Sequence, residues 1–405
     1  MKRSLIEIRE SVLQRMSDAD FIGYDPSAIQ FSRRYNKVRS LIRKVPTVLF
    51  RRILSSIFSR TIYYAGGLSV MILSPEKKEY AKGLALTLSG LSYDLKGKDT
   101  LVNSLVDRLL KKRVNGKFLW AHDLDYSFPG GKAVTTETPN LITTAFVANS
   151  FFDLYLKTGD DKYKDYLIES VNDLVETIPY KATGQDEICF MYTPVTDYHV
   201  HNANLLYCEM LAKKCYLEDS YSQNLINLIE SALRYSLRDF ENKKNYPYAG
   251  EPTPNNSVDN YHTGYLIRSL YEIDRLVGAY IEFDLKEHIN KLVDFYIDRF
   301  VGEDYIYRDA QRTVQSHSLA ESILIYCMFS GSIPVSSKSK YRCSIFKTID
   351  LLYSDKGFFI NNVKFWGGIK IYDRTEMIRW SNAWMFYALS VLGANQKDGG
   401  KDFRK

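Results

Sequence analysis

Six mostly apolar helical stretches recur along the chain, and they constrain its fold more than any other feature. Their starts lie roughly 55 to 65 residues apart, a spacing typical of repeated helical hairpins. A helix that is apolar nearly all round must be buried on all sides, so these six are predicted to form an inner ring. They span residues 78–95, 140–156, 201–217, 260–277, 316–329 and 380–393.

Amphipathic helices with one polar face lie between the apolar stretches. In residues 161–178, for example, Leu167, Val171 and Leu174 share an apolar face. Five such outer helices follow inner ones, near residues 100–113, 161–178, 222–241, 286–300 and 340–354. The sixth inner helix has no follower, so the helix near residues 35–58 is expected to pack beside it and close the ring. The sequence therefore predicts an all-α (α/α)6 toroid, a barrel of six helical hairpins.

The repeat also decides the number of domains. A chain of 405 residues exceeds the usual size of one core, but a ring of repeats can stay in one domain at this length. We expect an N-terminal basic segment over residues 1–30, a single toroid domain over 31–395 and a polar tail over 396–405. The only Gly-rich loop, FPGGKAVTTE, matches no phosphate-binding motif, and the five cysteines have no CxxC spacing. No cofactor and no metal are predicted.

Positive charge is concentrated at the start of the chain. Residues 1–60 hold 13 Lys/Arg against 5 Asp/Glu, whereas the whole chain has a net charge of +6. In KVRSLIRKVPTVLFRRILSSIFSR the basic residues alternate with apolar ones, which suits an anionic membrane face. The alternative is an outer helix whose arginines are simply solvated. No basic stripe occurs elsewhere, so nucleic acid is not an expected partner.

The start of the chain also bears on its location. MKRSLIEIRESVLQRM lacks the apolar core of a secretory signal, and the longest uncharged stretch, 61–75, is shorter than a membrane-spanning helix. We expect a cytoplasmic protein, peripheral at the inner face of the membrane if the basic start binds lipid.

Histidines gather in the loops that precede the inner helices. In such a ring these loops lie at one end and face a common funnel. They contain five of the six histidines, namely His122, His199, His201, His262 and His317. Five at equivalent positions favour a shared site over separate helix caps. His199 and His201 form an HxH pair, but at a helix start the two side chains point apart and no cysteine accompanies them, which disfavours zinc.

Acid–base chemistry on a carbohydrate suits these segments better than metal chemistry. Arg308 and Arg379 could hold a carboxylate, and Trp380 and Trp384 could stack on a sugar ring. A glycoside hydrolase would need two carboxylates across the bond, and no acid here has a distinguishing motif. The predicted proton carriers are Tyr198, His201, Tyr261, His262 and His317. The other predicted substrate-binding residues are Asn140, His199, Asn202, Asn204, Asp259, Asn260 and Glu321.

Four motifs carry a resemblance to a known family. At DYHVHNANLL, DNYHTGYLIRSLYEI, QSHSLAESI and RWSNAWMFYAL, the chain resembles bacterial polysaccharide biosynthesis proteins (VpsJ-like), over roughly residues 85 to 395. The YHTG segment at 261–264 is similar to the YHT segment in the helical domain of glucuronyl C-5 epimerases. The resemblance implies a helical toroid and a role in capsule, exopolysaccharide or O-antigen synthesis, without naming a reaction.

The residues and the resemblance together lead to one expectation. We expect a sugar-active enzyme that performs acid–base chemistry on a uronate-type sugar, as an epimerase or a lyase-like enzyme. Its expected partner is a carbohydrate substrate that is acidic or lipid-linked. The alternatives are a glycoside hydrolase and a non-catalytic component that binds a glycan or a lipid carrier.

Overall fold

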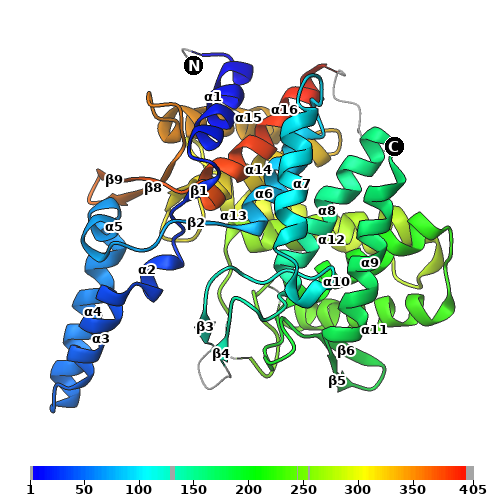
Figure 1. Ribbon diagram of the computed structural model, residues 1–405, viewed down its shortest axis with the longest axis horizontal. Coiled ribbons are helices and arrows are strands. Elements are labelled where there is room, and N and C mark those ends of the chain that lie inside the picture. Colours follow the sequence, from blue (N-terminus) through cyan, green and yellow to red (C-terminus); the bar gives the residue numbers. More distant parts are fainter. Residues whose placement is uncertain (1–2, 128–132, 244, 254–255, 398–405) are drawn as a thin grey trace.

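Six helices form a closed inner ring in the computed structural model, which describes residues 3–127, 133–243, 245–253 and 256–397 (Figure 1). Each inner helix contacts the next one along the chain, and the last contacts the first. The inner helices are α6 (Ala81–Leu91), α8 (Leu141–Thr158), α10 (His201–Glu218), α12 (Asn260–Val277), α14 (Ser316–Phe329) and α16 (Trp384–Lys397). Almost every described residue of α6, α8, α10 and α14 is buried or half-buried, as expected for helices enclosed on all sides.

A glycine allows the ring to close. Gly90 lies where α6 meets α16, and a Cβ added there would lie 2.6 Å from the Phe386 ring and 3.2 Å from Tyr387 Cα. Because the second of these atoms is backbone, a larger residue at this position would push the two helices apart. The missing side chain therefore sets the distance between the first and last inner helices.

Outer helices pack against the inner helix that precedes each of them in the chain. They are α7 (Asp99–Lys111), α9 (Asp161–Thr177), α11 (Gln223–Lys243), α13 (Leu285–Phe300) and α15 (Val335–Leu352). The sixth outer position, against α16, is taken by α1 (Leu5–Asp18). Ser4 caps this helix, and Ile8, Val12 and Met16 form its buried stripe. The predicted all-α toroid is confirmed.

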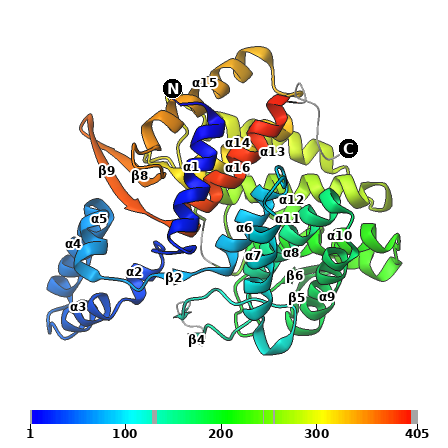
Figure 2. The same cartoon turned by 45° about the horizontal axis from the view of Figure 1, so that its top comes forward.

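The prediction that the helix near residues 35–58 closes the ring is wrong. That segment forms α3 (Arg33–Arg43) and most of α4 (Val48–Ala65), and α4 packs against α3, α5 (Gly67–Leu73) and β9 (Ile369–Glu376). Figures 1 and 2 show this hairpin projecting from the ring beside α2 (Ala28–Phe31). The physical reason is charge: α3 carries five Lys/Arg in eleven residues and has no buried residue, so it cannot serve as a packed outer helix. The ring instead begins within residues 1–30, which the sequence placed outside it.

Short antiparallel strands hold most of the loops before the inner helices. β1 (Ile22–Gly23) pairs with β2 (Lys78–Glu79), β3 (Tyr126–Ser127) with β4 (Ala133–Val134), and β5 (Tyr180–Gly184) with β6 (Glu187–Phe190). A three-stranded sheet in the order β7 (Val314–Gln315), β8 (Ile360–Trp366) and β9 precedes the last inner helix. β9 leads into a π-helical turn, η3 (Ile378–Ala383), which presents Arg379 and Trp380 before α16 begins.

Candidate active site

Aromatic rings from four elements meet inside the ring, near the starts of the inner helices. Tyr261 of α12 stacks on His317 of α14 with ring centroids 4.4 Å apart, and His317 stacks on Trp384 of α16 at 4.5 Å. Trp380 of η3 stands edge-on to His317 at 4.6 Å. His317 is therefore enclosed on both faces and one edge. These four side chains form an aromatic wall of the kind that sugar rings pack against.

A buried lysine, a buried tyrosine and His317 of this wall form a hydrogen-bonded chain. Lys82 Nζ of α6 donates to the Tyr265 hydroxyl at 3.2 Å, and that hydroxyl lies 2.9 Å from His317 Nε2. Since Lys82 donates, the Tyr265 hydroxyl can donate to His317, which then carries its own proton on Nδ1. Nδ1 is buried and has no hydrogen-bond partner among the described residues. Lys82 Nζ also lies 3.7 Å from the centroid of the Phe146 ring.

Burial and neighbouring charges set the protonation states of this chain. Burial, with Arg379 adding to it, holds the pKa of Lys82 well below its usual range. Burial together with Lys82 and Arg379 holds the pKa of His317 well below 6.5, so its imidazole is neutral at pH 7. Burial, with Glu321 adding to it, raises the pKa of Tyr265 well above 10, so its hydroxyl keeps its proton. The site thus holds a neutral base and a protonated acid in direct contact.

Arg379 lies beside the aromatic wall but is already bound by a carboxylate. Its Nε donates to Asp25 Oδ2 at 2.6 Å, and both side chains are almost fully buried. Its guanidinium also lies 5.1 Å from the centroid of the Trp380 ring. Asp25 follows β1, so the N-terminal segment supplies part of the site. A free Arg379 that clamps a substrate carboxylate, as the sequence suggested, is not what the structure shows.

Polar side chains, most of them half-exposed, lie near the wall and its charged groups. Burial, with Arg379 adding to it, lowers the pKa of His122 to about 4, and burial raises the pKa of Tyr192 to about 12. Asp259 caps α12 by accepting from the backbone nitrogen of His262 at 3.0 Å, and its Oδ2 lies 2.8 Å from Nδ1 of the same histidine. Arg308 lies 6.0 Å from the centroid of the Tyr261 ring. These groups could contact a ligand that rests on the wall.

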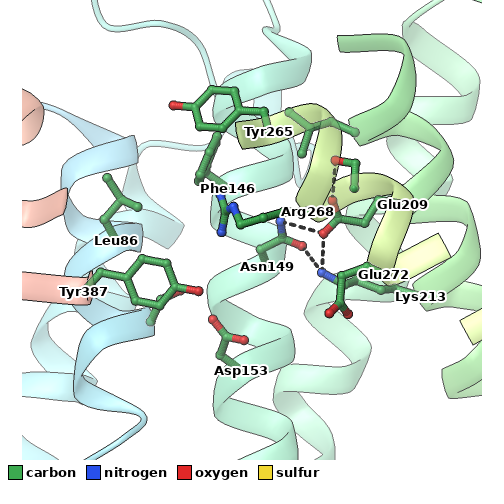
Figure 3. Close-up of a pocket in the computed structure, with 13 residues that line it drawn as sticks. Leu86, Phe146, Asn149, Asp153, Glu209, Lys213, Tyr265, Arg268, Glu272 and Tyr387 are labelled. Atoms are coloured by element: carbon green, nitrogen blue, oxygen red, sulfur yellow. Dashed lines mark hydrogen bonds and ion pairs between the residues drawn. The ribbon is translucent and has the colours of Figure 1, made fainter. Parts of the chain in front are cut away.

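A second, charged layer lies farther along the inner helices, near the middle of α10 and α12. Figure 3 shows its side chains around a pocket. Arg268 Nε lies 2.7 Å from Glu321, and Lys213 donates to Glu209 at 2.6 Å. Together with Tyr265, several of these side chains line a cavity of about 30 Å³. That volume accommodates one or two waters and no sugar. This charged layer therefore does not provide a sugar site itself, and it supports the residues of the aromatic wall from deeper in the ring.

His201 does not share a pocket with His262 and His317, so that part of the predicted site is wrong. Its Nε2 lies 2.7 Å from Asp239 Oδ2 and its Nδ1 lies 3.1 Å from Ser236 Oγ, both on α11. An α-helix turns about 100° per residue, so a histidine at the first position of α10 can face the outer helix while the next residue faces the ring. His201 is therefore a packing residue between two helices.

Asn202, the residue after His201, points into the ring. Asn202 lies on the same face of α10 as Leu206 and Glu209, which line the inner cavity. Its side chain is buried, and its Oδ1 has no hydrogen-bond partner among the described residues. A buried amide oxygen of this kind can accept a hydrogen bond from a ligand or a water.

Several other predicted polar residues serve the fold. Asn140 caps α8 by accepting from the backbone nitrogen of Thr143 at 3.0 Å. Asn204 donates to the carbonyl of Ala232 on α11 at 2.8 Å. Three more predicted residues lie in packed surroundings: Asn260, which bonds Ser322 and Tyr296, His199, which lies 5.8 Å from the Tyr235 ring, and Tyr198, which is half-buried against the core.

Sequence reasoning missed three side chains that the structure places at the site. Lys82 and Tyr265 lie within stretches that were interpreted only as apolar helices. The signal for Lys82 was present, because a charged residue inside a stretch that is predicted to be buried on all sides needs a specific partner. Asp25 lies far from every motif in the sequence, and only the three-dimensional fold brings it to Arg379. The described residues hold no group of three or more His, Cys, Asp or Glu that could bind a metal ion.

Comparisons with known proteins place the chain among toroids. No protein-family model matches it, and no curated protein matches it, so the resemblance to the VpsJ-like family stays a prediction. A cellobiose 2-epimerase from Spirochaeta thermophila matches with 11% identity and a TM-score of 0.54, over 79% of this chain and 87% of that structure. A family 76 glycoside hydrolase, a mannosidase from Bacteroides thetaiotaomicron, matches with 10% identity and a TM-score of 0.53, over 79% and 87%. A polysaccharide lyase matches with 11% identity and a TM-score of 0.52, over 79% and 90%. At such low identity these similarities establish the α/α toroid fold and leave the reaction open.

Proposed function

We propose that this protein is a carbohydrate-active enzyme that transfers a proton on a sugar bound against the aromatic wall. The observation that carries the proposal is the 2.9 Å contact between the Tyr265 hydroxyl and His317 Nε2 in buried surroundings. A neutral histidine and a protonated tyrosine in contact are the components of acid–base catalysis. The same fold occurs in an epimerase, a mannosidase and a polysaccharide lyase, so a sugar substrate fits this scaffold.

Proton removal can run through both side chains. Tyr265 takes the proton from the substrate carbon while it passes its own proton to His317 Nε2. Negative charge then develops on the substrate, and this charge stabilises the protonated imidazole and offsets the cost of its burial. Returning a proton from solvent to the other face of the carbon gives an epimer. Expelling the neighbouring oxygen substituent, which takes up the proton held by His317, gives an unsaturated sugar.

Positive charge near the chain favours an acidic sugar. The structure gives Lys82 no carboxylate partner within hydrogen-bond distance among the described residues, while Arg379 and Arg268 lie near enough to lower its pKa. A uronate carboxylate would provide such a partner and would also acidify the adjacent carbon–hydrogen bond. A role in assembling bacterial surface polysaccharide follows from the family resemblance and is part of this proposal.

A glycoside hydrolase is the weaker candidate. It needs one protonated and one ionised carboxyl group on either side of the bond. Burial raises the pKa of Glu321, which suits a general acid, although Arg268 opposes the shift. The other carboxylates near the wall are occupied, Asp25 by Arg379 and Asp259 by His262.

Hydrogen exchange in D2O tests the proposal. The protein is incubated with uronate-containing polysaccharides, and deuterium at the carbon beside the carboxylate is measured by NMR. We expect deuterium incorporation, or an ultraviolet-absorbing unsaturated product if elimination follows. His317→Gln should abolish both, while the matched variant His288→Gln on α13 should retain them. A new reducing end without exchange would show a hydrolase, and sugar binding without any of these products would show a non-catalytic binding protein.

A further inference from the structure

The projecting hairpin of α3 and α4 has a composition found nowhere else in the chain. Between Asp25 and Glu76 the sequence holds nine Lys/Arg and no Asp or Glu. These cations are Arg33, Arg34, Lys37, Arg39, Arg43, Lys44, Arg51, Arg52 and Arg60. An ordinary solvated helix carries charges of both signs, so this excess of one sign indicates a partner of opposite charge.

The same hairpin exposes large apolar side chains around its tip. Leu49, Phe50 and Leu41 are 64%, 60% and 57% exposed, and Ile53 and Ile57 are exposed as well. The described residues of α3 include none that is buried. Soluble proteins rarely leave so many large apolar side chains of one short segment in water unless the segment has a partner. The two helices are nevertheless held together, since the rings of Tyr35 and Phe58 lie 5.3 Å apart.

Charge and apolarity together identify the partner. A second copy of this hairpin would bring nine cations against nine cations and repel it. Nucleic acid would use the cations but would leave the apolar tip in water. A bilayer with anionic headgroups attracts the cations and accepts the apolar side chains among its acyl chains. We propose that the α3–α4 hairpin docks this protein on an anionic lipid surface.

The mode of binding follows from helix length and hydropathy. Among the described helices, none combines the length and the apolar character needed to cross a bilayer. The hairpin would therefore lie in the interface, with Leu49 and Phe50 inserted at the tip and the arginines level with the headgroups. Figure 1 shows the hairpin extending towards the same side as the β3–β4 and β5–β6 hairpins that precede inner helices. Docking would thus turn the end of the ring that bears the aromatic wall towards the bilayer. A lipid-linked sugar as substrate would follow from this orientation, and that last step alone rests on the proposed function.

Vesicle flotation of the full chain tests the docking. Vesicles of pure phosphatidylcholine are compared with vesicles that contain phosphatidylglycerol, at low and high salt. We expect binding to the anionic vesicles alone and release by high salt. The triple variant Arg43→Gln, Lys44→Gln, Arg52→Gln removes three exposed cations. Each cation near a membrane contributes about a fivefold factor, so the triple variant should bind about a hundredfold more weakly.

A matched variant and a second site make the test decisive. Lys96→Gln, Lys157→Gln, Lys356→Gln removes three exposed cations from the ring and should bind like the wild type. Phe50→Ser should weaken binding even at low salt, because it removes an inserted side chain. Circular dichroism checks that each variant is folded. Equal binding to both kinds of vesicle, no binding to either, or undiminished binding by the hairpin variants would overturn the proposal. A dimer in sedimentation that is lost on Phe50→Ser, without vesicle binding, would show that a second copy covers the tip. None of these measurements depends on a sugar reaction. Membrane docking can therefore fail while the proposed function stands.

Discussion

Two buried histidines stand at the starts of inner helices, yet they belong to different regions of the molecule. His201, the first residue of α10, faces the outer helix α11, where Asp239 and Ser236 bind both of its ring nitrogens. His317, the second residue of α14, faces the centre of the ring, where Tyr265 binds Nε2 and no described residue binds Nδ1. The two histidines differ by one position relative to the start of their helices. That difference makes His201 a packing residue and His317 a candidate proton carrier.

The charged groups around the two histidines also differ. Burial lowers the pKa of both histidines, but Asp239 opposes the shift at His201, whereas Lys82 and Arg379 reinforce it at His317. A histidine beside a carboxylate can keep a fixed hydrogen bond in either charge state. A histidine among cations stays neutral until a negative charge arrives. Only the second arrangement responds to a substrate.

The largest effect should come from His317→Gln. Glutamine keeps a polar side chain of similar reach but cannot accept the proton from Tyr265. Loss of a general base typically slows a reaction by about 100-fold or more. We expect a loss of that size in the D2O exchange rate, with only a small change in melting temperature. Exchange at the wild-type rate would remove His317 from the mechanism.

His201→Ala should have the opposite effect to His317→Gln: it should lower stability and leave the exchange rate nearly unchanged. The substitution leaves a cavity and removes a partner of the buried Asp239, although Lys243 Nζ still lies 3.2 Å from that carboxylate. Together these losses should lower the free energy of unfolding by about 2 to 4 kcal/mol. Urea titration measures this loss. The exchange rate per folded molecule should change little, and a variant as stable as the wild type but inactive would reverse our assignment.

The pH dependence of stability sharpens the contrast. The pKa of His317 in the folded chain lies below its unfolded value of about 6.5, so the unfolded chain binds more protons at acid pH. Stability is therefore lost as the pH falls below about 6.5. One such histidine accounts for about 1 kcal/mol between pH 7.5 and 5.5. Urea titrations at both pH values should show that His317→Gln loses about that much less than the wild type. Equal losses would mean that His317 is protonated in the folded protein.

Much of the fold, but only part of the site, could be predicted from the sequence. Helical periodicity depends on which residues are apolar, so the six inner helices, the five outer helices and the toroid were predictable. The closing helix was not, because the apolar stripe of α1 is short, while the longer pattern near residues 35–58 belongs to an exposed hairpin. Helix-start histidines were found as a group, but the sequence does not show which side of a helix each one faces. The ion pair of Asp25 with Arg379 joins residues 354 positions apart and needed the folded chain.

The smallest effect is expected for Asp259→Asn. This variant tests whether His262 contacts the substrate, as we propose for His317, or only packs, as His201 does. The ring of His262 lies 4.3 Å from that of Tyr261 in the aromatic wall, yet it is also paired with Asp259, much as His201 is paired with Asp239. Asp259→Asn keeps an oxygen that can cap α12, since asparagine and aspartate are nearly equal at this position, so stability should change by less than about 1 kcal/mol. The substitution removes the negative charge beside the imidazole and leaves His262 in place. If His262 contacts the substrate, the exchange rate should change a few-fold and its pH profile should shift. If His262 only packs against the wall, both should match the wild type, and the site would then rest on His317, Tyr265 and Lys82.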